Sequence, residues 1–537
     1  MAERRTVAWG WGYEDQQPTL EQQQAIAKGI ATSLGQSALE VKKAPTLDEI
    51  TLRAPRVTPP GSLASLCSTA TYDRVVHSYG KSFPDLLRAV RREFPNPPDI
   101  VAYPKTEADV VALLDWCSQM KAAAVPFGGG SSVVGGVEPP SGDAYRGTMS
   151  IDLRNLNKVL EIDNTSRAAR IQAGVYGPAL EDQLRPHGYT LRHYPQSFEF
   201  SSLGGWIATR SGGHFATMYT HIDDFVESLR VVTPKGTLES RRLPGSGAGP
   251  SPDRMFIGSE GILGIITEAW MRLQSRPVYR AAAAVEFPSF DKGVAAVRML
   301  SQAGLYPTNC RLLDPTEVAR NKVSDRAVTL LMLGFESADH PLEAWIQRAL
   351  ECCTDFGGTT PNGVTIKGGG ETAGREGSVG DWRDAFIRMP YQLGPMAAMG
   401  AIFDTTESAI TWERFPEFHA GVMESTQKAL NEVCGGGILS CRFTHVYPDG
   451  PAPYYTFLGM GRSGAELEQW HAVKGAACDA VIRHGGTVTH HHAVGRVHRP
   501  WYDQQRPDLF ASALRAAKSS LDPHGVLNPG VLIDPLG

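Results

Sequence analysis

Long apolar runs are missing from this 537-residue chain, and no stretch approaches the ~18 residues that span a bilayer. The first residues also lack the apolar core of a secretory signal peptide. None of the eight cysteines forms a Cys-x-x-Cys pair, which argues against a zinc-ribbon or thioredoxin-like redox site. These absences predict a soluble cytoplasmic protein with reduced thiols.

An excess of basic residues is absent as well. The chain has 52 Lys and Arg against 57 Asp and Glu, and its basic residues are scattered, so nucleic acid is not an expected partner. The length exceeds that of one small core, which predicts two or three domains.

The local patterns predict an α+β protein with four segments. Residues 1–94 form an N-terminal extension with a helix over Thr19–Leu34. In residues 95–276, a strand near Ile100–Pro104, a helix capped by Thr106 and Asp109, and a second strand lead into a glycine turn. Residues 277–484 alternate strands with helices near 290–302 and 342–354, as a cap domain with an antiparallel sheet would. Residues 485–537 form a closing segment with a helix near 507–520.

Three glycine-rich turns are candidates for ligand binding, at 125–136, 195–213 and 256–269. Glycine lets the backbone approach a ligand closely and exposes consecutive N–H groups that suit an anion. No lysine follows the first turn as in a Walker loop, and its spacing is not that of a Rossmann fingerprint. Each turn alone is also compatible with a purely structural role.

The order and spacing of the three turns resemble the FAD-binding (PCMH-type) domain of the vanillyl-alcohol-oxidase family, which has two α+β subdomains. The resemblance implies that the first turn wraps the FAD pyrophosphate and that the other two line the ribose and the isoalloxazine. The first turn has no histidine, the usual covalent attachment point in the family, so FAD is expected to be bound noncovalently. The implied cofactor-binding residues are Pro126, Phe127, Gly128, Gly129, Gly130, Ser131, Ser132, Gln196, Ser197, Phe198, Glu199, Phe200, Ser201, Ser202, Gly205, Thr209, Arg210, Ser211, Gly212, Glu260, Gly261, Ile262, Leu263, Gly264, Ile265 and Ile266.

Further segments narrow the resemblance to the alkyldihydroxyacetonephosphate synthase (alkylglycerone-phosphate synthase) family. They are W-G-W-G-Y near the N-terminus, P-Q-S-F-E-F-S-S-L-G-G-W, W-E-R-F, S-C-R-F-T-H-V-Y, H-H-H-A-V-G and the closing L-D-P-H-G-V-L-N-P-G. The resemblance implies exchange of the acyl group of acyl-dihydroxyacetone phosphate for a fatty alcohol through a flavin N5 adduct, a step of ether lipid synthesis. The alternative is an FAD-dependent oxidase or dehydrogenase of a hydroxy acid or alcohol.

The resemblance also implies catalytic residues. Arg442 matches an active-site arginine of the family, and Tyr454 matches a tyrosine that contacts phosphate, with Tyr455 as a rival for that role. His490, His491 and His492 match its triple-histidine segment, where imidazole can carry protons near neutral pH. On a strand, His490 and His492 would share one face and His491 would take the other. No nearby Asp, Cys and His grouping completes a metal site, and the resemblance is to a metal-free flavoenzyme, so no metal is expected.

Three features bear on the substrate. The stretch Tyr391–Phe403 suits an adaptable wall for a lipid tail, although ordinary core packing explains it equally well. Gly245 stands where the family has an arginine, which places the phosphate-bearing substrate in question unless Arg241 or Arg242 substitutes. The chain does not end in a peroxisomal tripeptide, which favours a bacterial-type cytoplasmic form. Peripheral contact with the inner face of the membrane and a homodimer are left open.

Overall fold

The computed structural model describes residues 4–324, 326–368 and 389–535. Two sheets make up the N-terminal half. The first has the order β1-β2-β4-β3, formed by Cys67–Ser68, Ile100–Ala102, Thr148–Asp152 and Ala123–Phe127. β4 is parallel to both β2 and β3, so β3 delivers the first glycine turn at the carboxyl edge of the sheet.

Helix α4 (Glu107–Met120) connects β2 to β3 and has the predicted capping box. The Asp109 N–H donates to the Thr106 hydroxyl at 3.2 Å, and the Asp109 carboxylate accepts the Thr106 N–H at 2.9 Å. Its apolar positions Val110, Leu113 and Leu114 are buried against the sheet. The predicted strand–helix–strand unit is therefore confirmed.

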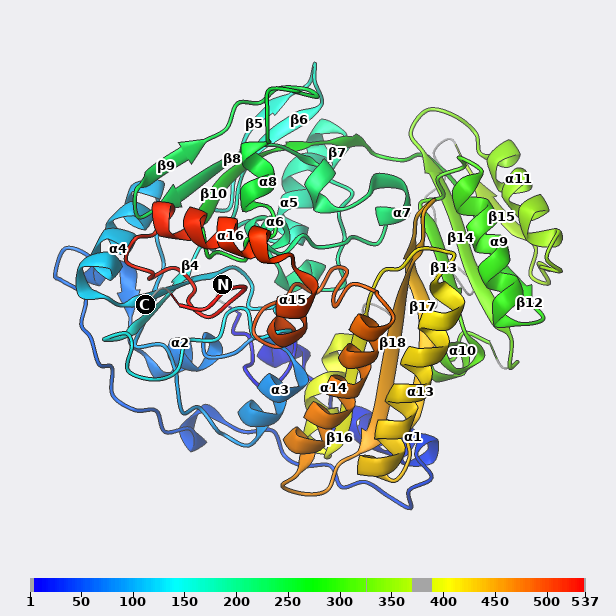
Figure 1. Ribbon diagram of the computed structural model, residues 1–537, viewed down its shortest axis with the longest axis horizontal. Coiled ribbons are helices and arrows are strands. Elements are labelled where there is room, and N and C mark those ends of the chain that lie inside the picture. Colours follow the sequence, from blue (N-terminus) through cyan, green and yellow to red (C-terminus); the bar gives the residue numbers. More distant parts are fainter. Residues whose placement is uncertain (1–3, 325, 369–388, 536–537) are drawn as a thin grey trace.

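The second sheet is antiparallel, with the order β5-β6-β10-β8-β9. Its strands are Val159–Asp163, Ala168–Gln172, Ile265–Arg272, Val226–Thr233 and Gly236–Glu239. Helices α5 (Gly177–Leu184), α6 (Leu203–Thr209), α8 (Pro252–Phe256) and α16 (Asp508–Leu521) pack beside it (Figure 1). A short pair, β7 (Tyr189–Thr190) with β11 (Gln274–Ser275), and helix α7 (Ala216–Tyr219) complete this half.

The third sheet has seven antiparallel strands in the order β15-β12-β14-β13-β17-β18-β16. In that order they span Val364–Lys367, Tyr279–Phe287, Thr329–Ser337, Asn309–Leu313, Ile438–Val446, Pro451–Met460 and Ala401–Glu407. Helices α9 (Phe290–Gln302), α10 (Pro315–Arg320), α11 (Glu343–Thr354), α13 (Phe415–Cys434) and α14 (Glu466–Arg483) accompany it (Figure 1). The predicted α+β fold with an antiparallel cap sheet is confirmed.

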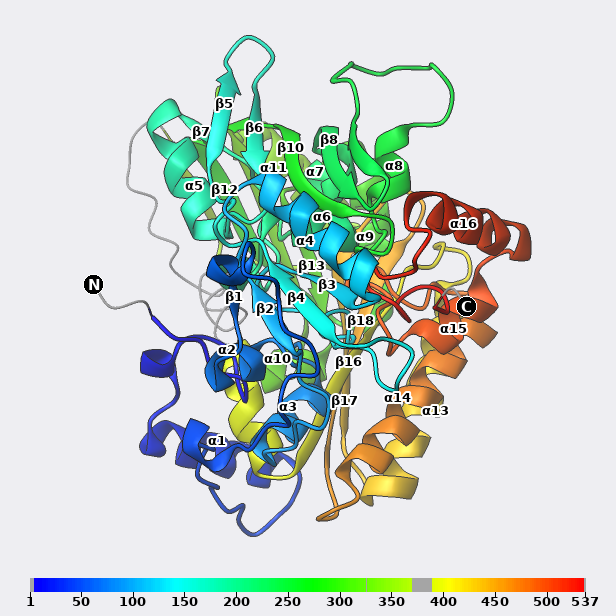
Figure 2. The same cartoon turned by 90° about the vertical axis from the view of Figure 1, so that its left-hand side faces the viewer.

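The two ends of the chain reach into these layers. Helix α1 (Leu20–Ser33) lies within the predicted helical stretch Thr19–Leu34, has Thr19 as its N-cap, and buries Ala27 and Ile30 in the core of the cap sheet. Helices α2 (Thr71–Val76) and α3 (Phe83–Val90) lie beside the first sheet (Figure 2). After α15 (Arg499–Gln505) and α16, the tail returns to β3, where the Ala124 N–H donates to the Val526 carbonyl at 2.8 Å. Within the described residues, no helix is both long and apolar enough to cross a membrane.

Candidate active site

A cavity of about 660 Å³ lies between the glycine turns of the N-terminal half and the cap sheet. The first two glycine turns form one wall of it. The predicted cofactor-binding residues that line the cavity are Gly128, Gly129, Gly130, Ser131, Ser132, Gln196, Ser197, Ser201, Ser202, Gly205, Thr209, Ser211 and Gly212.

These two turns pack directly on each other, which explains their glycines. A Cβ on Gly129 would lie 1.7 Å from the Phe200 carbonyl oxygen, and a Cβ on Gly128 would lie 2.2 Å from the Ser202 hydroxyl oxygen. Gly130 has a φ of +65°, which side chains other than glycine rarely adopt. A side chain at Gly128 or Gly129 would overlap the second turn. Backbone N–H groups and serine hydroxyls therefore form the cavity wall.

This wall suits the polar part of a dinucleotide. Backbone N–H groups and hydroxyls are the donors that bind a pyrophosphate, and the cavity volume lies in the range of cofactor pockets. The predicted residues that line the cavity therefore fit FAD, and the binding of its phosphates by Gly128–Ser132 stays a prediction.

The third turn lies behind that wall. Ile262, Leu263 and Ile266 are buried in the core of the second sheet. The Glu260 carboxylate accepts the N–H groups of Val494 and Gly495 at 2.9 and 2.8 Å, and burial raises its pKa to about 7. The predicted cofactor-binding residues outside the cavity lining are Pro126, Phe127, Phe198, Glu199, Phe200, Arg210, Glu260, Gly261, Ile262, Leu263, Gly264, Ile265 and Ile266. Their contribution to FAD binding stays a prediction.

The cap sheet aligns the predicted catalytic residues in one row across its strands. Glu407 pairs with Tyr454, Tyr454 pairs with Arg442, and Arg442 pairs with Leu313. Opposite residues of antiparallel strands share a face, so these side chains lie on the same side of the sheet. Arg311, two residues before Leu313, shares that face and lines the cavity.

Arg442 and Arg311 form a cationic part of the cavity. Both are buried, and Arg442 Nη1 donates to the Glu317 carboxylate at 2.7 Å. Burial and the neighbouring Arg442 charge lower the pKa of Arg311 to about 9. Arg320 and Lys322 line the same cavity. An anionic group placed here would offset the repulsion between buried cations.

Tyr454 lies against Arg442, whose guanidinium carbon is 4.0 Å from the ring centroid. Burial raises the pKa of Tyr454, so its hydroxyl keeps its proton at neutral pH and can donate it. Tyr455 points to the other face, where its hydroxyl lies 3.1 Å from His419 Nδ1 within the cap core. Tyr454 lines the cavity and Tyr455 does not.

The three consecutive histidines do not form a strand, which corrects the prediction of alternating faces. Residues 488–492 form a bent loop, because a buried carboxylate gathers their backbone. Glu407 accepts the N–H groups of His490, His491 and His492 at 2.5, 3.2 and 3.0 Å, and also the Thr489 hydroxyl at 2.5 Å. His491 and His492 line the cavity, whereas His490 lies behind them.

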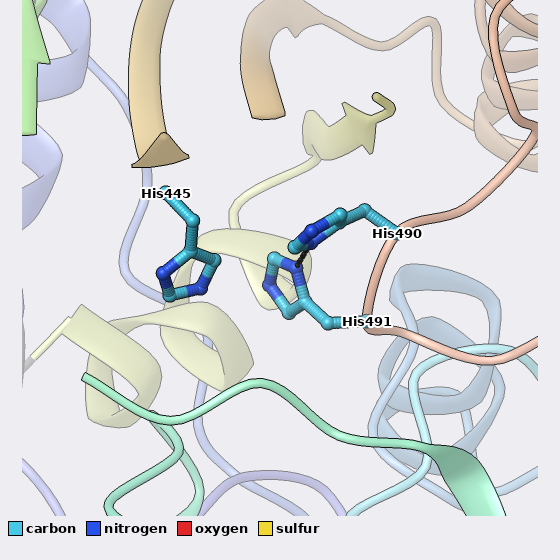
Figure 3. A group of neighbouring side chains, drawn as sticks. All are labelled: His445, His490 and His491. Atoms are coloured by element: carbon cyan, nitrogen blue, oxygen red, sulfur yellow. Dashed lines mark hydrogen bonds between the residues drawn. The ribbon is translucent and has the colours of Figure 1, made fainter. Parts of the chain in front are cut away.

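A further histidine joins this loop from β17. The ring nitrogens of His445, His490 and His491 all lie within 4.8 Å of one another, and Figure 3 shows the three rings converging. A residue distant in sequence therefore meets the run here, and the absence of a metal stays a prediction. Both nitrogens of His490 already have hydrogen-bonding partners, namely His491 on Nδ1 and His221 and Tyr447 on Nε2. Burial lowers the pKa of His490 to about 3, so its ring is neutral at pH 7.

The position of the missing family arginine lies away from the cavity. Gly245 is in an exposed loop, and Arg241 is exposed beside it. Arg242 is bound to Glu227 at 2.5 Å and to Asp163 at 2.8 Å. Neither arginine lines the cavity, so neither replaces the missing family arginine there, and the arginines of the cavity come from the cap.

The cavity also has an apolar part. Ala25, Ile26, Gly29, Ile30 and Ser33 of α1 lie along it at helical spacing. The predicted lipid-tail stretch contributes Leu393, Met396 and Phe403, while Ala401 and Ile402 of the same stretch are packed in the cap core. The stretch therefore lines the cavity at some positions and packs in the core at others, and its contact with a lipid tail stays a prediction.

The family models agree with this two-part site. A model described as FAD binding domain matches residues 98–240, and one described as FAD linked oxidases, C-terminal domain, matches residues 276–532. The alkyldihydroxyacetonephosphate synthase of Dictyostelium discoideum is 30% identical over 490 residues, which cover 86% of this chain and 77% of that protein. The chain belongs to the alkyldihydroxyacetonephosphate synthase family. It is an FAD-dependent enzyme.

Further comparisons support the assignment to the synthase family. A solved structure of an alkyldihydroxyacetonephosphate synthase superposes with a TM-score of 0.79 at 26% identity and covers 98% of each chain. A glycolate oxidase subunit of Bacillus subtilis (strain 168) is 26% identical over 449 residues, covering 82% of this chain and 89% of that protein. The substrates of this branch of the family are lipid-like small molecules.

Several residues of the site are not indicated by any sequence pattern. A β-bulge at Phe443/His445 shifts the pairing of β17, so His445 lies opposite Ala452 and on the cavity face. Strict alternation from Arg442 would have placed His445 on the other face. Arg311 had one detectable signal, a charged residue within the apolar strand C-R-L-L. Glu407 and His221 had none, because their role depends on tertiary contacts.

Proposed function

We propose that this enzyme exchanges the acyl group of acyl-dihydroxyacetone phosphate for a long-chain alcohol, an ether-forming step of lipid synthesis. One observation supports it above the others: the cavity that carries the dinucleotide-binding turns is lined both by buried cations and by an apolar wall. A phosphorylated head needs fixed cations, and an alkyl chain needs apolar lining. A hydroxy acid would need only the first of these.

Each part of the cavity has a role in this reaction. Arg442 and Arg311 bind the phosphate, while α1 and Met396 line the chain. Tyr454 holds its proton beside Arg442, donates it to the departing carboxylate oxygen and takes it back as the fatty acid ionises to a carboxylate. His491 and His492 accept a proton from the reacting carbon, which is returned when the ether forms, and a second proton from the alcohol. When FAD is bound, it supplies the electrophilic centre at which the dihydroxyacetone phosphate carbon is held between loss of the acyl group and arrival of the alcohol.

An anaerobic flavin titration tests the proposal. Palmitoyl-dihydroxyacetone phosphate should bleach the flavin absorbance of the purified holoenzyme, and hexadecanol should restore it as ether product forms. Palmitoyl-glycerol, which lacks the phosphate, is the matched control substrate and should leave the absorbance unchanged. If hydroxy acids or alcohols alone bleach the flavin and oxygen restores it, the exchange reaction is refuted.

That second outcome would identify the alternative function, an FAD-dependent oxidase or dehydrogenase of a hydroxy acid or alcohol. The similarity to the glycolate oxidase subunit favours it. The cavity's apolar part, lined by Gly29 and Met396, argues against a small hydroxy acid.

We further propose that the enzyme is cytoplasmic and takes its lipid substrates at the inner face of the membrane as a peripheral protein, and that it forms a homodimer. Leu509 and Phe510 at the start of α16 support a membrane contact, because they are 86% and 52% exposed. Sedimentation with anionic lipid vesicles should weaken in Leu509→Ser/Phe510→Ser and not in the neighbouring Asp508→Asn. Analytical ultracentrifugation should give twice the monomer mass, and a monomer mass would refute the dimer.

A further inference from the structure

A chain of hydrogen-bonding side chains leads away from the cavity, and the reaction just proposed leaves it without a role. It begins at His491, which lines the cavity and whose Nδ1 lies 2.9 Å from Nδ1 of His490. Nε2 of His490 in turn lies 3.1 Å from Nε2 of His221 and 3.0 Å from the Tyr447 hydroxyl oxygen. His221 Nε2 and the Tyr447 hydroxyl oxygen are 2.8 Å apart, so the last three groups form a closed triangle.

The outer end of this chain lies near the surface. His221 and Tyr447 are partly exposed, and Tyr447 is followed by the exposed residues Pro448 and Asp449. A surface hollow lined by Thr220 and Asp224, among others, borders His221. Three separate parts of the chain meet here: the segment after α7, the turn between β17 and β18, and the C-terminal loop.

The exchange reaction produces a proton that must leave the cavity. The bond between the dihydroxyacetone carbon and the ester oxygen breaks, and the fatty acid departs as a carboxylate. The alcohol oxygen bonds to the same carbon and loses its hydrogen. Ester and alcohol are neutral at these groups, whereas the products are a neutral ether and an anion. One proton is therefore released per turnover, with no oxidation or reduction.

The histidines are suited to moving such a proton. A neutral imidazole has one N–H and one free nitrogen, so it can accept a proton on one side while releasing another on the other side. The rings are held at hydrogen-bonding distance, which proton transfer requires. The Glu407 carboxylate, 3.5 Å from His491 Nδ1, stabilises the positive charge that passes through the first ring.

We infer that His491, His490 and His221, with Tyr447, form a relay that carries the proton released by the exchange reaction from the cavity to the surface near Thr220. The inference rests on the proposed function. His490, His221 and Tyr447 act through His491, so they are relay residues and not catalytic ones.

His221→Gln tests the relay, because glutamine keeps a polar group of similar reach but does not exchange protons. The first bleaching of the flavin by palmitoyl-dihydroxyacetone phosphate should keep its wild-type rate, since the proton stays on His491. Steady-state turnover should fall by roughly 10²-fold, the lower end of what a positioned acid–base group contributes. The solvent deuterium isotope effect on turnover should rise, and added imidazole should restore the rate. His187→Gln, an exposed histidine of the same domain, is the control.

A second measurement does not depend on turnover. Diethyl pyrocarbonate modifies accessible neutral imidazoles, so in the holoenzyme without substrate it should modify His221 before His490 and His491, as followed by peptide mass spectrometry. Modification of His490 first would place the surface opening elsewhere and overturn the relay. Wild-type turnover and isotope effect in His221→Gln would overturn it too, as would a slow variant that imidazole fails to rescue. A wild-type enzyme that forms no ether product would instead refute the proposed function and the relay with it.

Discussion

Glu407 is the residue whose replacement tests the active site most directly, because one carboxylate holds the backbone of all three consecutive histidines. Glu407→Gln keeps the size of the side chain but removes its charge and turns one acceptor oxygen into an NH₂ donor. If the remaining oxygen keeps the Thr489 and His492 partners, the His490 N–H faces a donor. An unsatisfied buried donor costs about 1–3 kcal/mol, and each charge-assisted hydrogen bond that becomes neutral loses about 1 kcal/mol. The loop should therefore lose about 3–5 kcal/mol.

The lost stabilisation of the loop should appear as more frequent local opening of residues 488–493, and not as unfolding of the whole protein. Since 1.4 kcal/mol is a factor of ten, amide exchange in peptides covering residues 488–493 should accelerate by roughly 10²–10³-fold. Hydrogen–deuterium exchange with mass spectrometry measures it, and Glu413→Gln, an exposed glutamate, is the control. Exchange within about threefold of wild type would refute the idea that the carboxylate holds the loop.

The pH dependence gives a second reading of the same variant. Burial alone would raise the pKa of Glu407, but its contacts with the histidines and Thr489 outweigh this and hold the pKa well below the ordinary value. Because the pKa of Glu407 is lower in the folded state than in the unfolded state, where it is about 4.3, the carboxylate stabilises the folded state at pH values above about 4.3. This stabilisation is lost as the pH falls through the lower pKa of the folded state. After correction for intrinsic exchange rates, the difference between wild type and Glu407→Gln should be constant from pH 8 to about pH 5 and should shrink only in stronger acid.

Four other substitutions give sharp expectations. Tyr454→Phe should bind flavin normally but suppress turnover, because the buried hydroxyl is the proposed acid, and unchanged turnover would remove it from the mechanism. Gly29→Phe should shift the preferred alcohol to shorter chains in a chain-length series. A Cβ at Gly29 meets nothing within 4 Å, so the added ring would occupy the apolar part of the cavity. Lys28→Phe, on the exposed side of α1, is the control and should leave the preference unchanged. Arg311→Gln should raise the KM for the phosphorylated substrate by about 10- to 100-fold, the worth of a charged hydrogen bond, and an unchanged KM would place the phosphate elsewhere. Gly129→Ala should abolish flavin retention on gel filtration, because its Cβ would overlap the Phe200 carbonyl; a yellow protein would contradict that geometry.

The sequence predicted those parts of the fold that local patterns determine. The capping box of Thr106 and Asp109, the helix after Thr19 and the glycine turns are read from short spacings, and the structure contains them. The prediction of alternating faces for His490, His491 and His492 was wrong because alternation assumes a regular strand. Here the Glu407 carboxylate, 83 residues earlier in the chain, bends the segment. His445 was missed because a bulge changed its face. Tertiary contacts of this kind leave no periodic signal in sequence.

The position of α1 has a consequence for the order in which the protein is completed. Ile30 belongs to the same core as Ala281 and later residues of the cap, so roughly 250 residues must follow it from the ribosome before the cap part of that core exists. At about 5–20 residues per second, the helix waits for more than ten seconds with its apolar side uncovered. The first sheet waits longer still, because Val526 pairs with Ala124 only when synthesis is nearly finished. The cavity is therefore completed only near the end of synthesis. Both the cofactor and the lipid must bind to the full-length protein.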